Sequence, residues 1–186
     1  MERKYEVLDL GQACDETLRF YAELPSKIYF AGFFGDLKGL APEPEEDLVG
    51  FGKAVEESLP FAARTRFDLV VTWDLFNYLR LEEVKVLTTY LRRFMSETAP
   101  LVSLIWYQKR IPAQPQHFAV FDEQSLEYRP TSPAEMDGPR YKEPELLRAM
   151  PSFRVSKSFL LRNGVQEYVF QPRPQSQSSP GGDWGG

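Results

Sequence analysis

The sequence predicts one α/β domain with a mostly parallel sheet and helices on both faces. Short apolar runs of strand length alternate with segments whose apolar residues recur at helical spacing. The 186 residues are enough for one domain and a tail. Near the C-terminus, Asn163-Gly164 separates two strand-like runs. Because both residues tolerate positive φ, this pair predicts a closing antiparallel hairpin.

The elements are predicted in the order β-α-β-α-β-α-β, then a flap, then α-β-β. The first strand, Tyr5–Leu10, ends at Gly11, and acidic residues begin the helix that follows, where they favour the positive end of its dipole. Continuous apolar character marks Phe67–Thr72 as a buried strand, and Val84, Leu87 and Leu91 form one face of a helix over Leu81–Met95. The other predicted helices and strands are Asp15–Glu23, Lys27–Phe30, 48–59, Leu101–Tyr107, Pro144–Met150, Phe153–Leu160 and Val165–Phe170.

Two segments fall outside this alternation. Residues 111–139 are rich in proline and contain two short strand-like pieces, 117–121 and 126–129, which indicates an insertion or flap. From Gln171 the chain is of low complexity. We therefore expect a domain over residues 1–170, with the flap inside it, and a disordered tail over 171–186.

Composition excludes several classes of function. With 22 Lys and Arg against 27 Asp and Glu, the net charge is −5, which is unfavourable for binding nucleic acid. A single cysteine permits no internal disulfide, and the lone histidine, His117, has no partners at metal-ligand spacing, so no metal site is predicted. No signal-peptide core and no apolar run of membrane-spanning length is found, so we expect a soluble, cytoplasmic protein.

A strand, a glycine turn and a helix N-terminus together form a cradle for a small polar ligand. Here they read VLDLGQACDETLRF, and Asp9 and Gly11 occupy the first two positions of an acidic-x-Gly-x-Gly-x-Gly motif. Ala13 and Asp15 stand where the other two glycines belong. An acid is expected about 20 residues after the glycines, at the end of the second strand, to hold ribose hydroxyls. That position is Ala31, and the nearest acid, Asp36, comes several residues later.

The segment from Leu59 to Leu79 has the most specific pattern in the chain. Leu59-Pro60-Phe61 is followed by the run RFDLVVTWDLFNYL. The first part of this run is a predicted buried strand, and Trp73 and Asp74 come directly after it. Together with the strand order and the glycine turn, this segment resembles the class I, Rossmann-like, S-adenosylmethionine (SAM)-dependent methyltransferases. Compared with that family, this sequence has no clear third strand, which is missing or vestigial, because residues 31–66 leave room for little more than one helix.

The resemblance implies a SAM site and an acceptor site at the carboxyl ends of the strands. Asp74 would be the catalytic residue, orienting or deprotonating a small-molecule or protein acceptor of unknown identity. The residues implied to contact the cofactor are Asp9, Gly11, Ala13, Asp15, Ala31 and Trp73. Those implied on the acceptor side are Asn77, Tyr78, Trp106 and Tyr107.

Other interpretations fit the same residues. Asp74 is also a candidate cap for the next turn, and the aromatic residues around it are candidates for the core. Ala13, Asp15 and Ala31 instead favour a non-catalytic methyltransferase-like protein that acts through a protein partner, with a sheet edge or the flap as its surface. A nucleotide- or NAD-binding module is a third alternative, but it requires the same acid at position 31.

Overall fold

The computed structural model describes residues 3–33, 48–161 and 164–174. The first part of the fold contains β1 (Tyr5–Asp9), α1 (Asp15–Ala22), β2 (Ser26–Phe30), α3 (Leu48–Ser58), β3 (Leu69–Trp73), the 3₁₀ helix η1 (Leu75–Tyr78), α4 (Leu81–Arg92) and β4 (Leu101–Trp106). The second part contains β5 (Arg110–Pro112), β6 (His117–Asp122), β7 (Ser125–Arg129), β8 (Glu135–Asp137), α5 (Glu143–Ala149), β9 (Phe153–Leu160) and β10 (Val165–Pro172).

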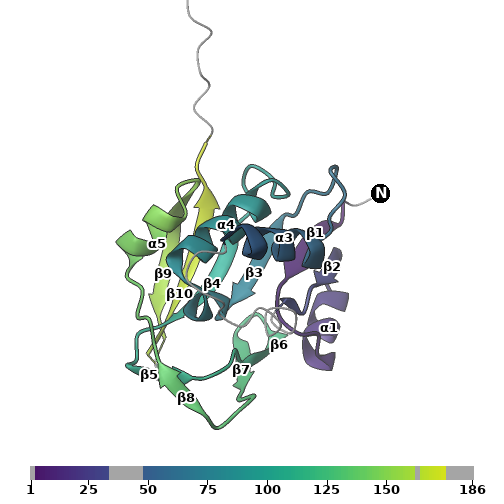
Figure 1. Cartoon of the computed structure of the whole chain (residues 1–186). Helices are drawn as coiled ribbons and strands as arrows, with labels where there is room; N and C mark the ends of the chain where they lie inside the picture. The colour runs from purple at the N-terminus through teal and green to yellow at the C-terminus, as the bar shows by residue number, and fades with distance from the viewer. Residues whose placement is uncertain (1–2, 34–47, 162–163, 175–186) are drawn as a thin grey trace, which may run out of the picture.

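The central sheet has the strand order β2-β1-β3-β4-β10-β9. The first four strands are parallel, and β10 lies antiparallel between β4 and β9. The predicted fold class and the C-terminal antiparallel hairpin are therefore confirmed (Figure 1). Among the described residues no strand lies beyond β2, where the family's third strand would be, and Asp36 falls in the segment 34–47, outside those residues.

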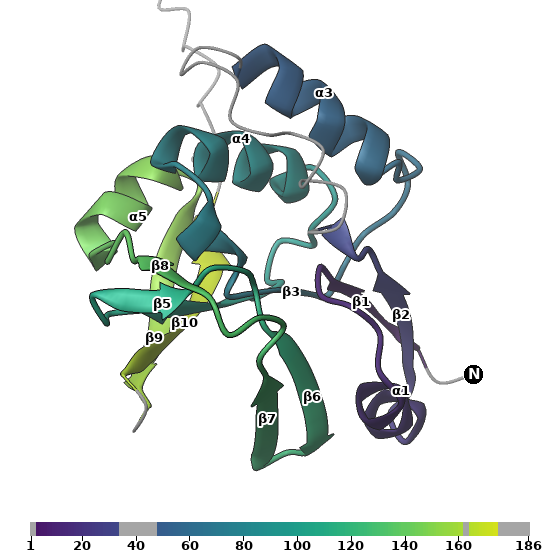
Figure 2. The ribbon, with the colours of Figure 1, turned by 60° about the horizontal axis from the view of Figure 1, so that its bottom comes forward.

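Different elements cover the two faces of the sheet. Helices α3, α4 and α5 lie on one face, whereas α1 and the β6–β7 hairpin lie on the other (Figure 2). The predicted helices on both faces are thus confirmed, with a single helix on the second face among the described residues. Because parallel strands point their carboxyl ends to one edge, β1 and β3 bring the glycine turn and the Trp73-Asp74 segment together there.

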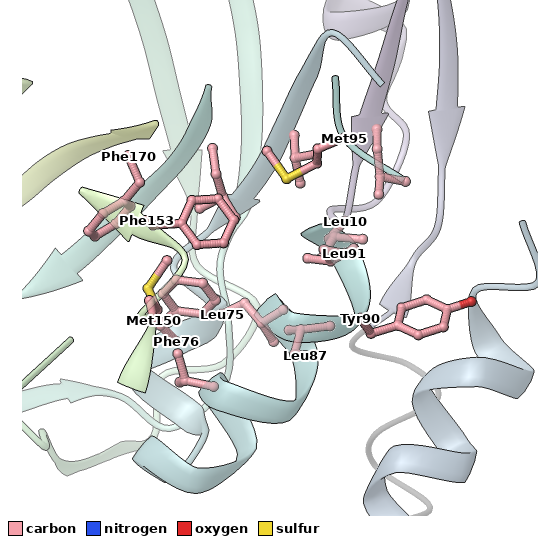
Figure 3. Packing of buried hydrophobic residues seen from close by; sticks show 14 of the residues in the cluster. Leu10, Leu75, Phe76, Leu87, Tyr90, Leu91, Met95, Met150, Phe153 and Phe170 are labelled. Atoms are coloured by element: carbon pink, nitrogen blue, oxygen red, sulfur yellow. The ribbon is translucent and has the colours of Figure 1, made fainter. Parts of the chain in front are cut away.

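The main core lies between the sheet and the three-helix face. Apolar residues one helical turn apart, such as Val84, Leu87 and Leu91 on α4, are buried against the strands. Phe76 from η1 joins Met150 and Phe153, which follow α5, in the same cluster (Figure 3). This packing holds η1, and with it the end of β3, in a fixed place.

The predicted flap is a structured insertion. Its two strand-like pieces form the antiparallel β6–β7 hairpin, and β5 pairs with β8 at the two ends of the insertion. The β5–β8 pair is too short for the sequence to reveal. At the C-terminus, β10 runs to Pro172, two residues past the predicted domain boundary, and residues 175–186 of the predicted tail lie outside the described part. None of the described helices combines the length and the apolar character that crossing a bilayer requires.

Candidate ligand site

The glycine turn joins the ends of β1, β2 and β3. The Asp9 carboxylate is buried and accepts the N–H of Gly11 at 2.8 Å. The N–H of Ala31 donates to the Asp9 carbonyl, and the N–H of Gly32 donates to the Gly11 carbonyl. Burial raises the pKa of Asp9 to about 6, although the hydrogen bonds from Gly11 and Trp73 partly oppose this shift. Asp9, Gly11 and Ala31 therefore meet, as the sequence predicts.

Trp73 lies directly against this turn. It is the last residue of β3 and has a φ of +47°, a left-handed conformation that is strained for a bulky residue, at a point where the β3–β4 register shifts. Its indole N–H donates to Asp9 Oδ1 at 2.6 Å. A Cβ placed on Gly11 would lie 2.7 Å from Cδ1 and Nε1 of the indole. Gly11 is thus required because the chain's own tryptophan occupies the space above it.

The flap covers the outer face of that tryptophan. The ring of Phe118, on β6, stacks on the indole with centroids 4.8 Å apart and planes 5° apart. This aromatic was missed by the sequence reasoning. The available signal is the run of four apolar residues, Phe118 to Phe121, which is consistent with a partly buried strand but does not show which side chain is covered.

The first turn of α1 holds the flap in place. Thr17 Oγ1 accepts the N–H of Val120 at 3.0 Å, and the Cys14 thiol faces the carbonyl of Phe118 at 3.7 Å. Arg129 forms an ion pair with Glu16 at 2.8 Å, which lowers the pKa of Glu16 to about 2. The predicted cofactor residues Ala13 and Asp15, in the same stretch, are exposed and do not line the cavity described below.

Asp74 is buried beside Trp73. Its Oδ2 accepts the N–H of Gln116, in the flap, at 3.1 Å. Burial raises the pKa of Asp74 to about 7, because the effect of burial exceeds the opposite effect of the hydrogen bonds around the carboxyl group. The side chain does not cap η1, so the interpretation of Asp74 as a helix cap is corrected. Instead, its backbone carbonyl accepts the amide of Asn77 at 2.7 Å.

The four predicted acceptor-side residues have structural contacts. The amide of Asn77 donates to the carbonyls of Asp74 and Leu104 and accepts the N–H of Trp106, which ties the end of β3 to β4. The Tyr78 hydroxyl donates to the carbonyls of Pro112 and Gln114 at the base of the flap, and burial raises its pKa.

The remaining two residues pack in different clusters. The ring of Trp106 is buried under the flap, with the edge of Tyr128 against it. Tyr107 packs on the main core and its hydroxyl lies 2.7 Å from that of Tyr168. Adjacent residues of an extended chain face opposite ways, so Tyr107 is separated from the other three.

A cavity of about 370 Å³ opens next to Trp73, beneath the flap. Its wall comes from four segments: Gly11–Gln12, Thr72–Leu75, Gln114–His117 and Arg129–Thr131. Its volume falls in the range of small-molecule sites. Within the described part of the chain, no group of three His, Cys, Asp or Glu side chains is arranged to hold a metal ion.

Comparison with solved structures identifies the fold. The chain matches the pyocyanin biosynthetic protein PhzM (TM-score 0.50, 12% identity, 92% of this chain and 51% of PhzM). It also matches an S-adenosylmethionine-dependent methyltransferase from Clostridium acetobutylicum (TM-score 0.51, 12% identity, 91% and 84%). A third match is 1,6-didemethyltoxoflavin-N1-methyltransferase from Burkholderia thailandensis (TM-score 0.52, 14% identity, 92% and 72%), solved with 1,6-didemethyltoxoflavin and S-adenosylhomocysteine bound.

These similarities show that the chain has the fold of class I methyltransferases. The chain spans about half the length of PhzM. No protein-family model matches the sequence, and no curated protein is similar to it.

Two features of the glycine turn depart from the pattern of a dinucleotide-type cradle. In dinucleotide-type cradles the glycine lets the ligand approach the backbone, and an acid at the end of the second strand binds the ribose. Here the indole of Trp73 lies on the side of Gly11 to which a Cβ would point. β2 ends at Phe30 and is followed by Ala31-Gly32, without a carboxylate. Trp73, predicted to contact the cofactor, thus contacts the glycine turn itself and also lines the cavity.

Proposed function

We propose that this chain is a non-catalytic protein with the methyltransferase fold, which acts by binding and transfers no methyl group from SAM. The observation that supports this most is the position of Trp73 within van der Waals contact of Gly11. A ligand that approaches Gly11 from the side to which a Cβ would point has to displace the indole first, because both cannot occupy the same space.

Several contacts oppose that displacement. The indole donates to the buried Asp9, stacks on Phe118, and sits under a flap that α1 fastens through Thr17 and Glu16. If the open state is a minor one, the affinity for SAM falls in proportion to its population. Each 1.4 kcal/mol spent on opening weakens binding about tenfold.

Methyl transfer from SAM to an unknown acceptor is the competing proposal, and the cavity beside Asp74 favours it. A carboxyl group with a pKa of about 7 is suited to accept a proton near neutral pH. This proposal requires that Trp73 and the flap move away from Gly11 when SAM binds.

Calorimetric titration with SAM and with S-adenosylhomocysteine tests the two proposals. We expect the wild-type chain to bind neither ligand at millimolar concentration. Trp73→Ala, checked for folding by circular dichroism, is the informative variant, because any binding that it gains measures how far the indole blocks the cradle. Micromolar binding by the wild type that disappears in Gly11→Arg would overturn the non-catalytic proposal.

A further inference from the structure

The cavity beside Trp73 contains a buried carboxyl group with no cationic partner. Asp74 is 1% exposed and lies on the cavity wall. Among the described residues, no Lys, Arg or His side chain forms an ion pair with it. Its Oδ2 accepts the backbone N–H of Gln116, and the side chains of Trp106 and Tyr78 also lower its pKa as neutral hydrogen-bond donors. Burying a charge without a partner is unfavourable, so such a carboxyl group is suited to a positively charged ligand.

Two further polar atoms at this place lack partners. Gln116 is 6% exposed and lines the cavity, and its side-chain Oε1 accepts no hydrogen bond, while its Nε2 donates to the carbonyl of Gln114. The buried indole N–H of Trp106 also lacks an acceptor in full hydrogen-bond geometry. Trp106 does not line the cavity, but its N–H lies close enough to Asp74 to lower the pKa of that group. Orphaned buried polar atoms are rare in folded proteins and indicate a missing water or ligand.

The rest of the wall combines apolar surface, paired polar groups and two exposed polar side chains, Gln12 and His117. Trp73, Leu75, Pro115 and Pro130 supply apolar surface. Arg129 is the charged side chain of the outer wall, and it is neutralised by Glu16 at 2.8 Å and Glu127 at 3.3 Å. An anionic ligand would therefore meet the Asp74 carboxylate, and it would have to compete with Glu16 and Glu127 for Arg129.

We propose that this cavity binds a small organic cation, a primary ammonium or amidinium group carried on a compact apolar body. One N–H group of the ligand donates to Asp74 and a second to Oε1 of Gln116, while the apolar body lies against Trp73 and the two prolines. This inference rests on the proposed function, because it gives the binding protein a ligand class in place of a methyl acceptor.

Binding of benzylammonium, with benzyl alcohol as the uncharged analogue, tests the inference. Calorimetry on the full chain at mildly alkaline pH is expected to detect benzylammonium and not the alcohol. Asp74→Asn keeps the shape but removes the charge, and we expect it to weaken binding at least tenfold, as charge-assisted hydrogen bonds contribute about 1.5–3 kcal/mol. Asp137→Asn, at a carboxylate 77% exposed, makes the same change in net charge and should leave binding unaltered.

The pH and a second variant sharpen the result. Benzylammonium should bind more weakly below the pKa of Asp74, and Gln116→Leu should weaken it while circular dichroism stays native. No binding by the wild type, or equal binding by Asp74→Asn, overturns this inference and leaves the non-catalytic proposal intact. Binding of SAM at the glycine turn, in contrast, overturns the non-catalytic proposal whatever benzylammonium does.

Discussion

The ring of Phe118 lies parallel to the indole of Trp73, so that a side chain of the flap closes over a side chain at the end of β3. Phe118 is 8% exposed, whereas Phe121, on the same strand, is 46% exposed. We expect Phe118→Ala to lower the free energy of unfolding by about 3 kcal/mol, since it removes a buried aromatic ring. Urea denaturation measures this, and Phe121→Ala is the control, with an effect of about 0.5 kcal/mol or less. Equal losses in the two variants would show that the stacking is not a stabilising contact.

Gly11 is expected to tolerate no side chain while Trp73 is present. Gly11→Ala places a methyl group 2.7 Å from the indole and should destabilise the fold by about 1–3 kcal/mol. Gly52→Ala, inside α3, meets only Val86 at 3.7 Å and should stabilise by about 0.5–1 kcal/mol. In a Trp73→Ala background the penalty at Gly11 should shrink, which a double-mutant cycle measures. A penalty that is unchanged there would place its cause elsewhere.

Asn77 is expected to stabilise the fold rather than bind a ligand. Asn77→Ala leaves the N–H of Trp106 and the carbonyl of Leu104 without this partner, so we expect a loss of about 2–4 kcal/mol in denaturant unfolding. Gln12→Ala removes an exposed amide from the cavity wall and should change stability by less than about 0.5 kcal/mol. A stable Asn77→Ala protein would restore the acceptor-side role that the sequence suggested.

Stability should fall as the pH rises toward neutrality. Burial raises the pKa of Asp74 from 3.8 to about 7 and that of Asp9 from 3.8 to about 6. Both groups hold their protons more tightly in the folded state, so the free energy of unfolding decreases between pH 3.8 and about 7 and then levels off. The lowered pKa of Glu16 acts in the opposite direction, but only at pH values below the ordinary pKa of a glutamate side chain, 4.5.

Asp74→Asn isolates the contribution of one of these groups. Urea unfolding at about pH 5 and about pH 8 should show a smaller pH-dependent loss in Asp74→Asn than in the wild type. Asp137→Asn, at an exposed carboxylate, should keep the wild-type loss. The same pH dependence in all three proteins would mean that Asp74 titrates normally in the folded state.

The sheet was predictable because its information is local. Each strand of the parallel half is a short apolar run, and the Asn-Gly pair marks the hairpin, so the elements and their order along the chain follow from pattern. The grouping of Asp9, Gly11 and Ala31 is what the family resemblance implied. The orientations of single side chains do not follow from the sequence pattern. The left-handed φ of Trp73 turns its indole over Gly11, and no feature of the sequence WDLFNYL reveals that angle.

The flap contacts are the other part that the sequence does not reveal. Phe118, Gln116 and Arg129 reach the site from an insertion about 100 residues away from α1, and their partners are set by tertiary packing. Asn77 and Tyr107, predicted on the acceptor side, show that residue type does not reveal the partners of a side chain either. Their residue types suit an acceptor site, yet backbone atoms and the Tyr168 hydroxyl use their polar groups.

The attachment of the flap to the first turn of α1 sets an order of events during folding. Thr17 and Val120 are 103 residues apart, and Glu16 and Arg129 are 113 apart, so these contacts close among the longest loops in the chain. Closing long loops is slow because their entropy is lost before any contact is gained. During synthesis, α1 is also made well before the hairpin. We therefore expect the contacts between the flap and α1 to form late in folding, after the local contacts within each element.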